Sequence, residues 1–387
     1  MILETDFPPD IRVENEINSL AKAGFSLTVI CPTQEKNRVG SSNIKGVDVQ
    51  RFYMSSLIYK TGVGQLKFPF YYNFFKKNIS RTLQLLNKTF EVVHSHDLSM
   101  AKIGLYFANQ LGAKAVLDLH ENYPYLIKDA HHTQKGLGRL LSDYKKWISF
   151  EKNIVKSFKN IITVVEEMSE RMLVFDDRPE VYHVYQNVIN SEDIPDYSKP
   201  NNRDSLELIY VGGITPARGI QTVIQAISLI PSEIQISLNI YGKGIYQDHL
   251  KEMVNNLKLS DKVHFKGFID QSDVIRTIQD HDVALIPHYR SIQNNNSSPN
   301  KLFQYMSTGR AVISTNCDSI KRVIKGSESG ITYSDRNYQE LSKVLIELSE
   351  NPESVIDMGK KGYKAVTGQF NTTIEGQKLS DFYKKLR

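Results

Sequence analysis

The stretch SSPNKLFQYMSTGRAVIST, residues 297–315, decides the fold because it passes from loop to helix to strand within one short segment. Ser298 and Asn300 are residue types that cap helices, so we predict a helix over residues 301–307 with a glycine at its end. Residues 311–314 then form a short apolar strand. This loop–helix–strand order is typical of an α/β domain with a parallel sheet.

The start of the predicted helix is also a candidate anion site. Its first turn offers free backbone N–H groups, and Lys301 adds a cation, a combination that suits a diphosphate. Gln304 follows one turn later on the same face. Taken alone, the segment is equally typical of an ordinary structural unit without a ligand.

Length and composition predict two domains and exclude several classes of protein. A chain of 387 residues exceeds one ordinary core, and 48 Lys+Arg against 43 Asp+Glu is too balanced for a nucleic-acid binder. Cys31 and Cys317 are far apart, so they provide neither a disulfide framework nor a Cys-x-x-Cys metal pair. No apolar run of about 18 residues and no signal peptide are found. We therefore expect a cytoplasmic protein that at most touches the inner face of the cell membrane.

The first half alternates strands and helices in the way of a parallel sheet covered on both faces. The predicted strands are residues 1–5, 26–31, 90–94, 115–119 and 160–165, and an amphipathic helix with apolar Ile11, Ile17, Leu20 and Ala21 is predicted over residues 11–23. HSHD at residues 94–97 and DLHEN at residues 118–122 follow two of these strands. Because sites in such sheets lie at the carboxyl ends of strands, both motifs are candidate site segments.

The second half restarts the same pattern after a polar segment. Residues 191–203 contain two prolines and no periodicity, which indicates a linker. The strands predicted after it are residues 206–211, 236–241, 263–265, 283–286, 311–314 and 330–333, with a helix over 220–229. We predict domains at residues 1–190 and 204–370, followed by a helix within 371–387 that packs beyond its own sheet.

The chain resembles retaining glycosyltransferases of the GT-B fold, in glycosyltransferase family four. The resemblance rests on the order and spacing of several segments: FPPDIRVENEINSLAKAGFSLTVIC from residue 7, HSHDL from 94, LDLHENYP from 117, VYQNVIN from 184, YVGGITPARGI from 210, IYGKG from 240 and SPNKLFQYMSTGRAVIST from 298. It implies two doubly wound Rossmann-like domains that face each other across a cleft, the first binding the acceptor and the second the nucleotide-sugar donor.

In the second domain, the resemblance assigns a set of donor-binding residues. Arg218, before Gly219, matches the basic residue that grips the diphosphate, and Lys301 replaces a second basic residue whose position is Gly213 here. Gln304 and Asn296 stand where the family has two glutamates, the first against the ribose and the second, a catalytic candidate, against the donor sugar. The remaining expected donor-binding residues are Gly212, Gly242, Gly267, Phe268, Ser298, Pro299 and Asn300.

In the first domain, His120 matches a histidine that faces the donor sugar in many relatives, and we expect it to be catalytic. The resemblance places further candidates on the acceptor side, namely Asp10, Arg12, His96, Asp97 and Glu121. For Asp10, a helix N-cap is an equally good interpretation. His94 is most simply a strand residue.

The resemblance implies transfer of a sugar from a nucleotide-diphosphate-sugar, UDP-linked by family frequency, to a hydroxyl with retention of configuration. The acceptor would be a glycan or a lipid-linked glycan in cell-surface polysaccharide synthesis. Arg218, Lys301 and the helix N-terminus would neutralise the leaving diphosphate, so we expect neither a metal nor a cofactor.

Two basic and aromatic clusters suggest membrane contact or, equally, core helices with a solvated face. The first is KFPFYYNFFKK at residues 67–77, and the second contains Lys145, Lys146, Trp147, Phe150 and Lys152.

Three other functions can be considered, of which two are disfavoured by the sequence. Because Asn296, Gln304 and Gly213 depart from the family, the chain could be a catalytically weak protein that binds a nucleotide-sugar or stabilises a partner enzyme. A nucleotide-sugar epimerase is disfavoured, since no carboxylate stands at the matching donor positions. A nucleotide-dependent dehydrogenase is disfavoured because neither GGITPARG nor GKG completes the G-x-G-x-x-G pattern.

Overall fold

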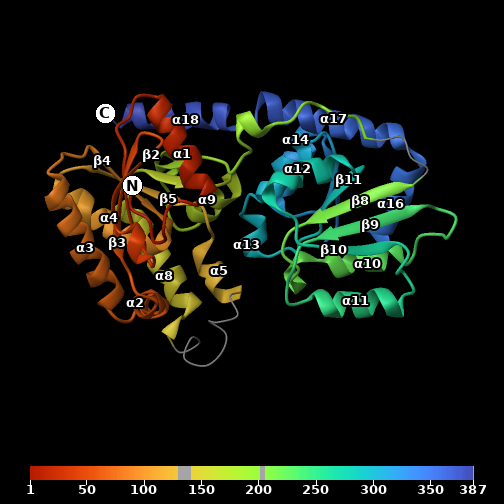
Figure 1. Ribbon diagram of the computed structural model, residues 1–387, viewed down its shortest axis with the longest axis horizontal. Helices are drawn as coiled ribbons and strands as arrows, with labels where there is room; N and C mark the ends of the chain where they lie inside the picture. The colour runs from red at the N-terminus through yellow and green to blue at the C-terminus, as the bar shows by residue number, and fades with distance from the viewer. Residues whose placement is uncertain (130–140, 201–204, 387) are drawn as a thin grey trace. The chain divides into compact units, whose positions relative to one another are not determined.

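The computed structural model describes residues 1–129, 141–200 and 205–386. Two compact units emerge, one formed by Met1–Gln186 with Thr373–Arg387 and the other by Asn187–Thr372. Each unit is an α/β fold, as predicted (Figure 1). Residues 201–204, which hold the end of the predicted linker and the predicted start of the second domain, and residue 387 lie outside the described residues.

The boundary between the units differs from the one predicted at the polar stretch 191–203. Val188 already packs in the core of the second unit, and Ile189 forms a parallel bridge with Asn371. Further along, the buried Arg310 guanidinium donates to the carbonyl of Ser198 at 2.6 Å. The polar stretch is therefore held against the second unit by hydrogen bonds that composition does not reveal.

The first unit contains a sheet whose two parts join at Ile2. Its strands are β1 (Thr28–Thr33), β2 (Gly40–Ile44), β3 (Val47–Tyr53), β4 (Val92–His96), β5 (Lys114–Leu119), β6 (Ile161–Thr163) and β7 (Tyr182–Val184). They run in the orders β2-β3-β1 and β4-β5-β6-β7. Ile2 forms parallel bridges to Ile30 and Ser95, which links β1 to β4. The strand predicted over residues 1–5 is thus reduced to this one paired residue.

Helices cover both faces of that sheet. They are α1 (Ile11–Lys22), α2 (Ser56–Thr61), α3 (Phe70–Leu86), α4 (Asp97–Leu111), α5 (Tyr123–Asp129), α8 (Tyr144–Ile154), α9 (Glu166–Leu173) and α18 (Thr372–Lys385). Side chains of α3, α4 and α8 pack in clusters on one face, and those of α1 and α18 pack on the other. Within α1, Ile11 is 60% exposed, contrary to its predicted core position, whereas Arg12 and Glu16 are buried.

The C-terminal helix α18 belongs to the first unit (blue in Figure 1). Leu379 and Tyr383 pack in one cluster with Leu20, Val116 and Ile162. Ile374, in the first turn of α18 and ahead of this cluster, is 37% exposed.

The two basic and aromatic segments are mainly core helices. Tyr71 and Phe75 of α3 are buried, and Trp147 of α8 is 2% exposed. Only Phe68 and Phe70 remain exposed aromatics in the segment 67–77. Among the described helices, none combines the length and the apolar content needed to cross a bilayer.

The second unit has a parallel sheet of Rossmann-like order. Its strands are β8 (Leu206–Val211), β9 (Ile236–Tyr241), β10 (Val263–Gly267), β11 (Val283–Ile286), β12 (Ala311–Thr315) and β13 (Gly330–Tyr333). They run in the order β10-β9-β8-β11-β12-β13. The chain direction across the sheet reverses between β8 and β11, and ligands of such sheets bind beyond the carboxyl ends of the strands at this reversal.

Helices again cover both faces. They are α10 (Ile220–Ile227), α11 (Gln247–Asn256), α12 (Gln271–Gln279), α13 (Ile292–Asn295), α14 (Asn300–Ser307), α15 (Asp318–Ser327), α16 (Tyr338–Glu350) and α17 (Pro352–Gly368). α10, α11 and α16 contribute to one core cluster, and α12, α14 and α15 to the other. The predicted side-chain cap of α14 is wrong, because Pro299 occupies the N-cap and no side chain bonds to the first turn.

The close approach of α17 to the turn before β12 allows this packing to be tested. A Cβ added at Gly359 in α17 would lie 2.1 Å from the Gly309 carbonyl oxygen, so Gly359→Ala should push the helix off the sheet. We expect a loss of about 1–3 kcal/mol in the free energy of unfolding, measured by chemical denaturation. Gly326→Ala, an exposed helix position with nothing within 4 Å, is the control and should be neutral or slightly stabilising. Equal effects of the two variants would contradict the packing.

Candidate functional site

Three loops meet at the carboxyl edge of the second unit's sheet. The backbone N–H of Gly212 donates to Tyr241 O at 2.9 Å, and that of Gly242 donates to Gly267 O at 2.7 Å. Gly242 has φ +143°, and a Cβ there would lie 1.9 Å from Gly212 O. Only glycine therefore allows the ends of β8 and β9 to approach this closely.

Lys301, in the first turn of α14, reaches into these loops. Its Nζ donates to Val211 O at 2.9 Å and lies 4.6 Å from the centre of the Tyr210 ring. A Cβ on Gly212 would lie 2.6 Å from this Nζ, so the lysine touches the glycine turn. Burial, together with repulsion from Arg218, lowers the pKa of Lys301 to about 7.

Arg218 stands on the other side of this edge, at the end of a 3-10 turn, Pro216–Arg218. Its Nη1 donates to the His288 ring at 3.2 Å. Burial and the two nearby cations, Lys301 and Arg218, hold the pKa of His288 well below its usual value, so its ring is neutral and can accept. Gly219 has φ +69°, and a Cβ there would lie 1.8 Å from Pro287 O, which fixes the arginine loop against the end of β11.

No carboxylate balances the two cations. Within the described ranges, neither Lys301 nor Arg218 forms an ion pair with Asp or Glu. Two cations that repel each other beside a helix N-terminus make a site that favours an anion. The structure thus brings together Gly212, Gly242, Arg218, Gly219 and Lys301, all predicted from the sequence.

The other predicted donor residues are more scattered. Asn296 is 9% exposed and its Nδ2 donates to Ile292 O at 2.7 Å, within its own turn. Gln304 is half-buried one turn after Lys301, and Phe268, after Gly267 at the end of β10, is 68% exposed. Gly213 O accepts from the Tyr210 hydroxyl, Ser298 and Pro299 precede α14, and Asn300 is exposed at its first position.

An Asp-x-Asp triplet, a pattern whose carboxylates can bind a metal ion, occurs in this unit at residues 280–282. Asp282 immediately precedes β11 and its carboxylate accepts from Glu207 N at 2.9 Å. The triplet therefore lies at the amino end of the strand, whereas Arg218 and Lys301 lie at the carboxyl end.

In the first unit, His120 follows β5 between two carboxylates. Its Nδ1 lies 3.5 Å from Asp118 Oδ2, and its Nε2 lies 3.6 Å from Asp97 Oδ1. Burial opposes the charged ring, but the two carboxylates outweigh burial and raise the pKa of His120 to about 10. His120 is therefore an imidazolium at neutral pH. Asp97 has φ +67°, a left-handed conformation that few side chains adopt.

Beneath His120 is a buried ion pair. Arg12 donates to Asp118 through Nε at 2.8 Å and Nη2 at 2.6 Å, and both side chains are inaccessible. His96 is also buried, with Nδ1 3.1 Å from Asp118 Oδ2. The prediction that Arg12 and His96 face an acceptor is wrong, because neither reaches the surface.

The remaining acceptor-side candidates have simpler positions. Asp10 is the N-cap of α1 and accepts from Val13 N at 3.1 Å, the alternative left open by the sequence. Glu121 is half-buried and follows His120 directly.

Sequence reasoning missed His288, Glu16 and the role of His94. A signal existed for two of them. Glu16 lies four residues after Arg12 on the apolar face of one helix, and His94 and His96 lie two apart in a strand, so each pair shares a face. His288 had no comparable signal.

The lysine at this edge makes a testable contribution to stability. Because the pKa of Lys301 is lower in the folded than in the unfolded chain, the folded state binds fewer protons between about pH 7 and 10, so stability should rise with pH across that window. Lys301→Met removes this cost, partly offset by the lost bond to Val211 O. We expect a gain of about 1–2 kcal/mol at pH 7 that disappears toward pH 10, measured by denaturation. Lys251→Met, an exposed lysine on α11, is the control; a Lys301→Met difference independent of pH would contradict the assignment.

Two family models match this chain, one after the other. Residues 11–193 match the model described as Glycosyltransferase Family 4, and residues 193–365 match the model described as Glycosyl transferases group 1.

Curated relatives and a solved structure agree with these matches. An uncharacterized glycosyltransferase of Methanocaldococcus jannaschii is 21% identical over 278 residues, covering 66% of this chain and 68% of the relative. The amylovoran biosynthesis glycosyltransferase AmsK of Erwinia amylovora is 24% identical over 183 residues, covering 47% of this chain and 45% of AmsK, less than half its length. HepE of Anabaena in complex with UDP has a TM-score of 0.72 at 13% identity, over 99% of both chains, a likeness of fold alone.

Two consecutive family matches and the shared fold show that this chain belongs to the GT-B glycosyltransferases described as Glycosyltransferase Family 4 and Glycosyl transferases group 1.

Proposed function

We propose that this chain is a retaining glycosyltransferase that uses a nucleotide-diphosphate-sugar, a UDP-sugar by the resemblance, to glycosylate a glycan or lipid-linked acceptor in surface polysaccharide synthesis. The observation that carries the proposal is the pair Lys301 and Arg218, which share the carboxyl edge of the second sheet without a carboxylate partner among the described residues. HepE, solved with UDP and with UDP-glucose, supports the choice of nucleotide, and AmsK supports the pathway.

The cations suit the charge that develops as the sugar leaves. A departing diphosphate gains negative charge, and donors fixed in advance stabilise it without reorganisation. Arg218 is held by His288, and Lys301 by Val211 O, so both are fixed before the donor arrives. We propose that these cations neutralise the diphosphate in place of a metal.

His120 is the proposed catalytic residue of the first unit. As an imidazolium it can donate a hydrogen bond to a sugar hydroxyl or stabilise charge on the donor. Asp118 and Asp97 lie 3.5 and 3.6 Å from its two ring nitrogens, and their charges favour the protonated ring. Asp118 is in turn fixed by Arg12.

An aromatic cavity supports a lipid-linked acceptor. A cavity of about 310 Å³ in the first unit lies among α3, α4 and α8, with Phe68, Tyr72 and Trp147 in its lining. Lys67 and Lys102 stand beside these rings, a pairing that suits an apolar chain with an anionic head. Equal transfer rates to a lipid-linked acceptor and to its lipid-free glycan would contradict this half of the proposal.

A second candidate is a protein that binds a nucleotide-sugar with little turnover. Asn296 supports it, because its amide N–H already bonds Ile292 O and the charge of the family's glutamate is missing. This candidate predicts donor binding without product.

The diphosphate assignment predicts the behaviour of Arg218→Ala. Loss of a charge-assisted bond to phosphate should weaken donor binding about 10- to 100-fold, measured by calorimetry with UDP-glucose or the preferred nucleotide-sugar. Arg276→Ala, an exposed arginine on α12, is the matched control and should bind normally. Unchanged affinity in Arg218→Ala would show that the diphosphate does not lie here.

The catalytic assignment predicts a different result for His120→Ala. Turnover should fall about 100-fold while the KM for the donor changes less than about threefold, because the imidazolium acts on the transition state more than on binding. Steady-state kinetics with the preferred donor and acceptor measure both constants. His249→Ala, exposed on α11, is the control. An unaffected kcat would return His120 to a structural role.

A further inference from the structure

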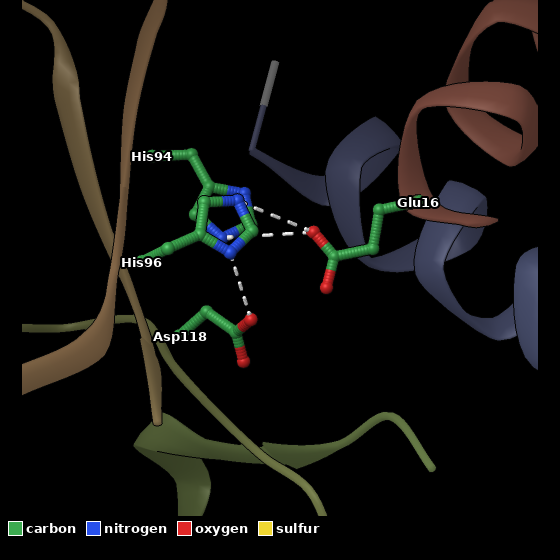
Figure 2. Close-up of side chains that lie close together, drawn as sticks. All are labelled: Glu16, His94, His96 and Asp118. Carbon is green, nitrogen blue, oxygen red and sulfur yellow. Dashed lines mark ion pairs between the residues drawn. The ribbon is translucent and has the colours of Figure 1, made fainter. Parts of the chain in front are cut away.

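A second cluster of chemistry-bearing side chains lies beneath His120, deep in the first unit. His94 and His96 alternate along β4, and their rings stack with centroids 4.3 Å apart and planes 11° from parallel. Glu16 of α1 faces the edges of both rings, and Asp118 lies on the far side of His96 (Figure 2). All four side chains are at most 3% exposed.

In both imidazoles, Nδ1 faces a polar side chain. His94 Nδ1 lies 2.6 Å from the Tyr383 hydroxyl, and His96 Nδ1 lies 3.1 Å from Asp118 Oδ2. The Nε2 atom of each ring therefore points away from these partners and toward Glu16. Dashed lines in Figure 2 join both Nε2 atoms to one oxygen of the Glu16 carboxylate.

The three converging atoms lie within 4.8 Å of one another, somewhat wider than the ligands of one bound ion. Glu16 Oε2 lies 3.6 Å from His96 Nε2 and 3.9 Å from His94 Nε2, too far for hydrogen bonds. Within the described residues, neither Nε2 nor either Glu16 oxygen has a hydrogen-bond partner. Ligands bound to one zinc ion at about 2.1 Å and at tetrahedral angles stand about 3.4 Å apart. Because the two rings lie nearly parallel, one imidazole must also turn before both Nε2 lone pairs point at one ion.

Outer contacts of the kind found around metal ligands are already in place. Asp118 and the Tyr383 hydroxyl orient the two rings, and Arg12 Nε lies 3.2 Å from Glu16 Oε1, the oxygen turned from the rings. Carboxylates and hydroxyls that hold the second nitrogen of a histidine ligand are typical of zinc sites. Arg12 also pairs with Asp118, so a single guanidinium faces two buried carboxylates.

We propose that Glu16, His94 and His96 bind one divalent transition-metal ion, zinc by the chemistry of two imidazoles and a carboxylate, and that this ion fixes α1 to β4. All three side chains are buried and leave one position of a tetrahedral ion for a further ligand, and Asp118 belongs to the same cluster. The site is separate from the diphosphate-binding cations of the second unit and does not depend on the proposed function.

The full chain, purified without chelator, is the material for the test. Elemental analysis should find about one zinc per chain. After chelation, the chain should show a lower thermal midpoint that Zn²⁺ restores, and Co²⁺ should produce the visible absorption of a tetrahedral nitrogen and oxygen site. A metal-free chain that shows no cobalt bands and no zinc-dependent midpoint would overturn the proposal, whatever the chain's activity.

Variants locate the ion. His94→Gln and Glu16→Gln should each weaken Co²⁺ binding at least about 10-fold, whereas His183→Gln, a histidine of the same unit outside the cluster, should not. Full cobalt bands in folded His94→Gln and Glu16→Gln chains would place the ion elsewhere. If either variant fails to fold, the chelation experiment on the unmodified chain still decides the question.

Discussion

The burial of Lys301 beside Arg218 is the constraint on which this edge of the second unit depends. Two cations share one edge of the sheet, and within the described residues no carboxylate pairs with them. They are tolerated because a backbone carbonyl holds one and a neutral histidine holds the other. The strand order reverses at this point, between β8 and β11, and glycines allow the loops there to pack closely against one another. The proposed diphosphate site accounts for an edge built at this electrostatic cost.

The main electrostatic feature of the first unit is the buried ion pair between Arg12 and Asp118. Asp118 accepts two bonds from Arg12 in a site closed to water, and the same carboxylate faces His96 below and His120 above. A buried charge pair of this kind is costly to form and more costly to break. His120 stands at the end of β5 as a cation because Asp97 and Asp118 face it, while burial keeps the histidines beneath it neutral. The carboxylate of Asp118 thus lies between the half-buried His120 and the buried His96.

The sequence was sufficient where burial alone determines structure. The strands 206–211, 236–241, 283–286 and 330–333 were predicted with the bounds that the structure has, because parallel strands covered on both faces are continuous apolar runs. Gly219 and Gly242 could be assigned to turns because glycine is the residue type that such turns most often require.

Prediction failed where polar groups are buried against partners distant in the chain. Arg12 and Asp118 are 106 residues apart, and nothing in either segment indicates that they pair. Arg12 therefore seemed available for an acceptor, although it is the centre of a buried network. The boundary at Gln186 was missed because side-chain bonds, such as that from Arg310 to Ser198, hold a polar stretch that composition marks as a linker.

The most direct test of the account is a thermal-shift screen of the unmodified chain against UDP-, GDP-, ADP-, dTDP- and CMP-sugars without added metal. A ligand that binds only the folded state raises the midpoint by mass action. The account predicts a clear shift with one nucleotide class, strongest for UDP-sugars, that a chelator does not remove. No shift with any nucleotide-sugar at millimolar concentration would contradict a donor site at Lys301 and Arg218.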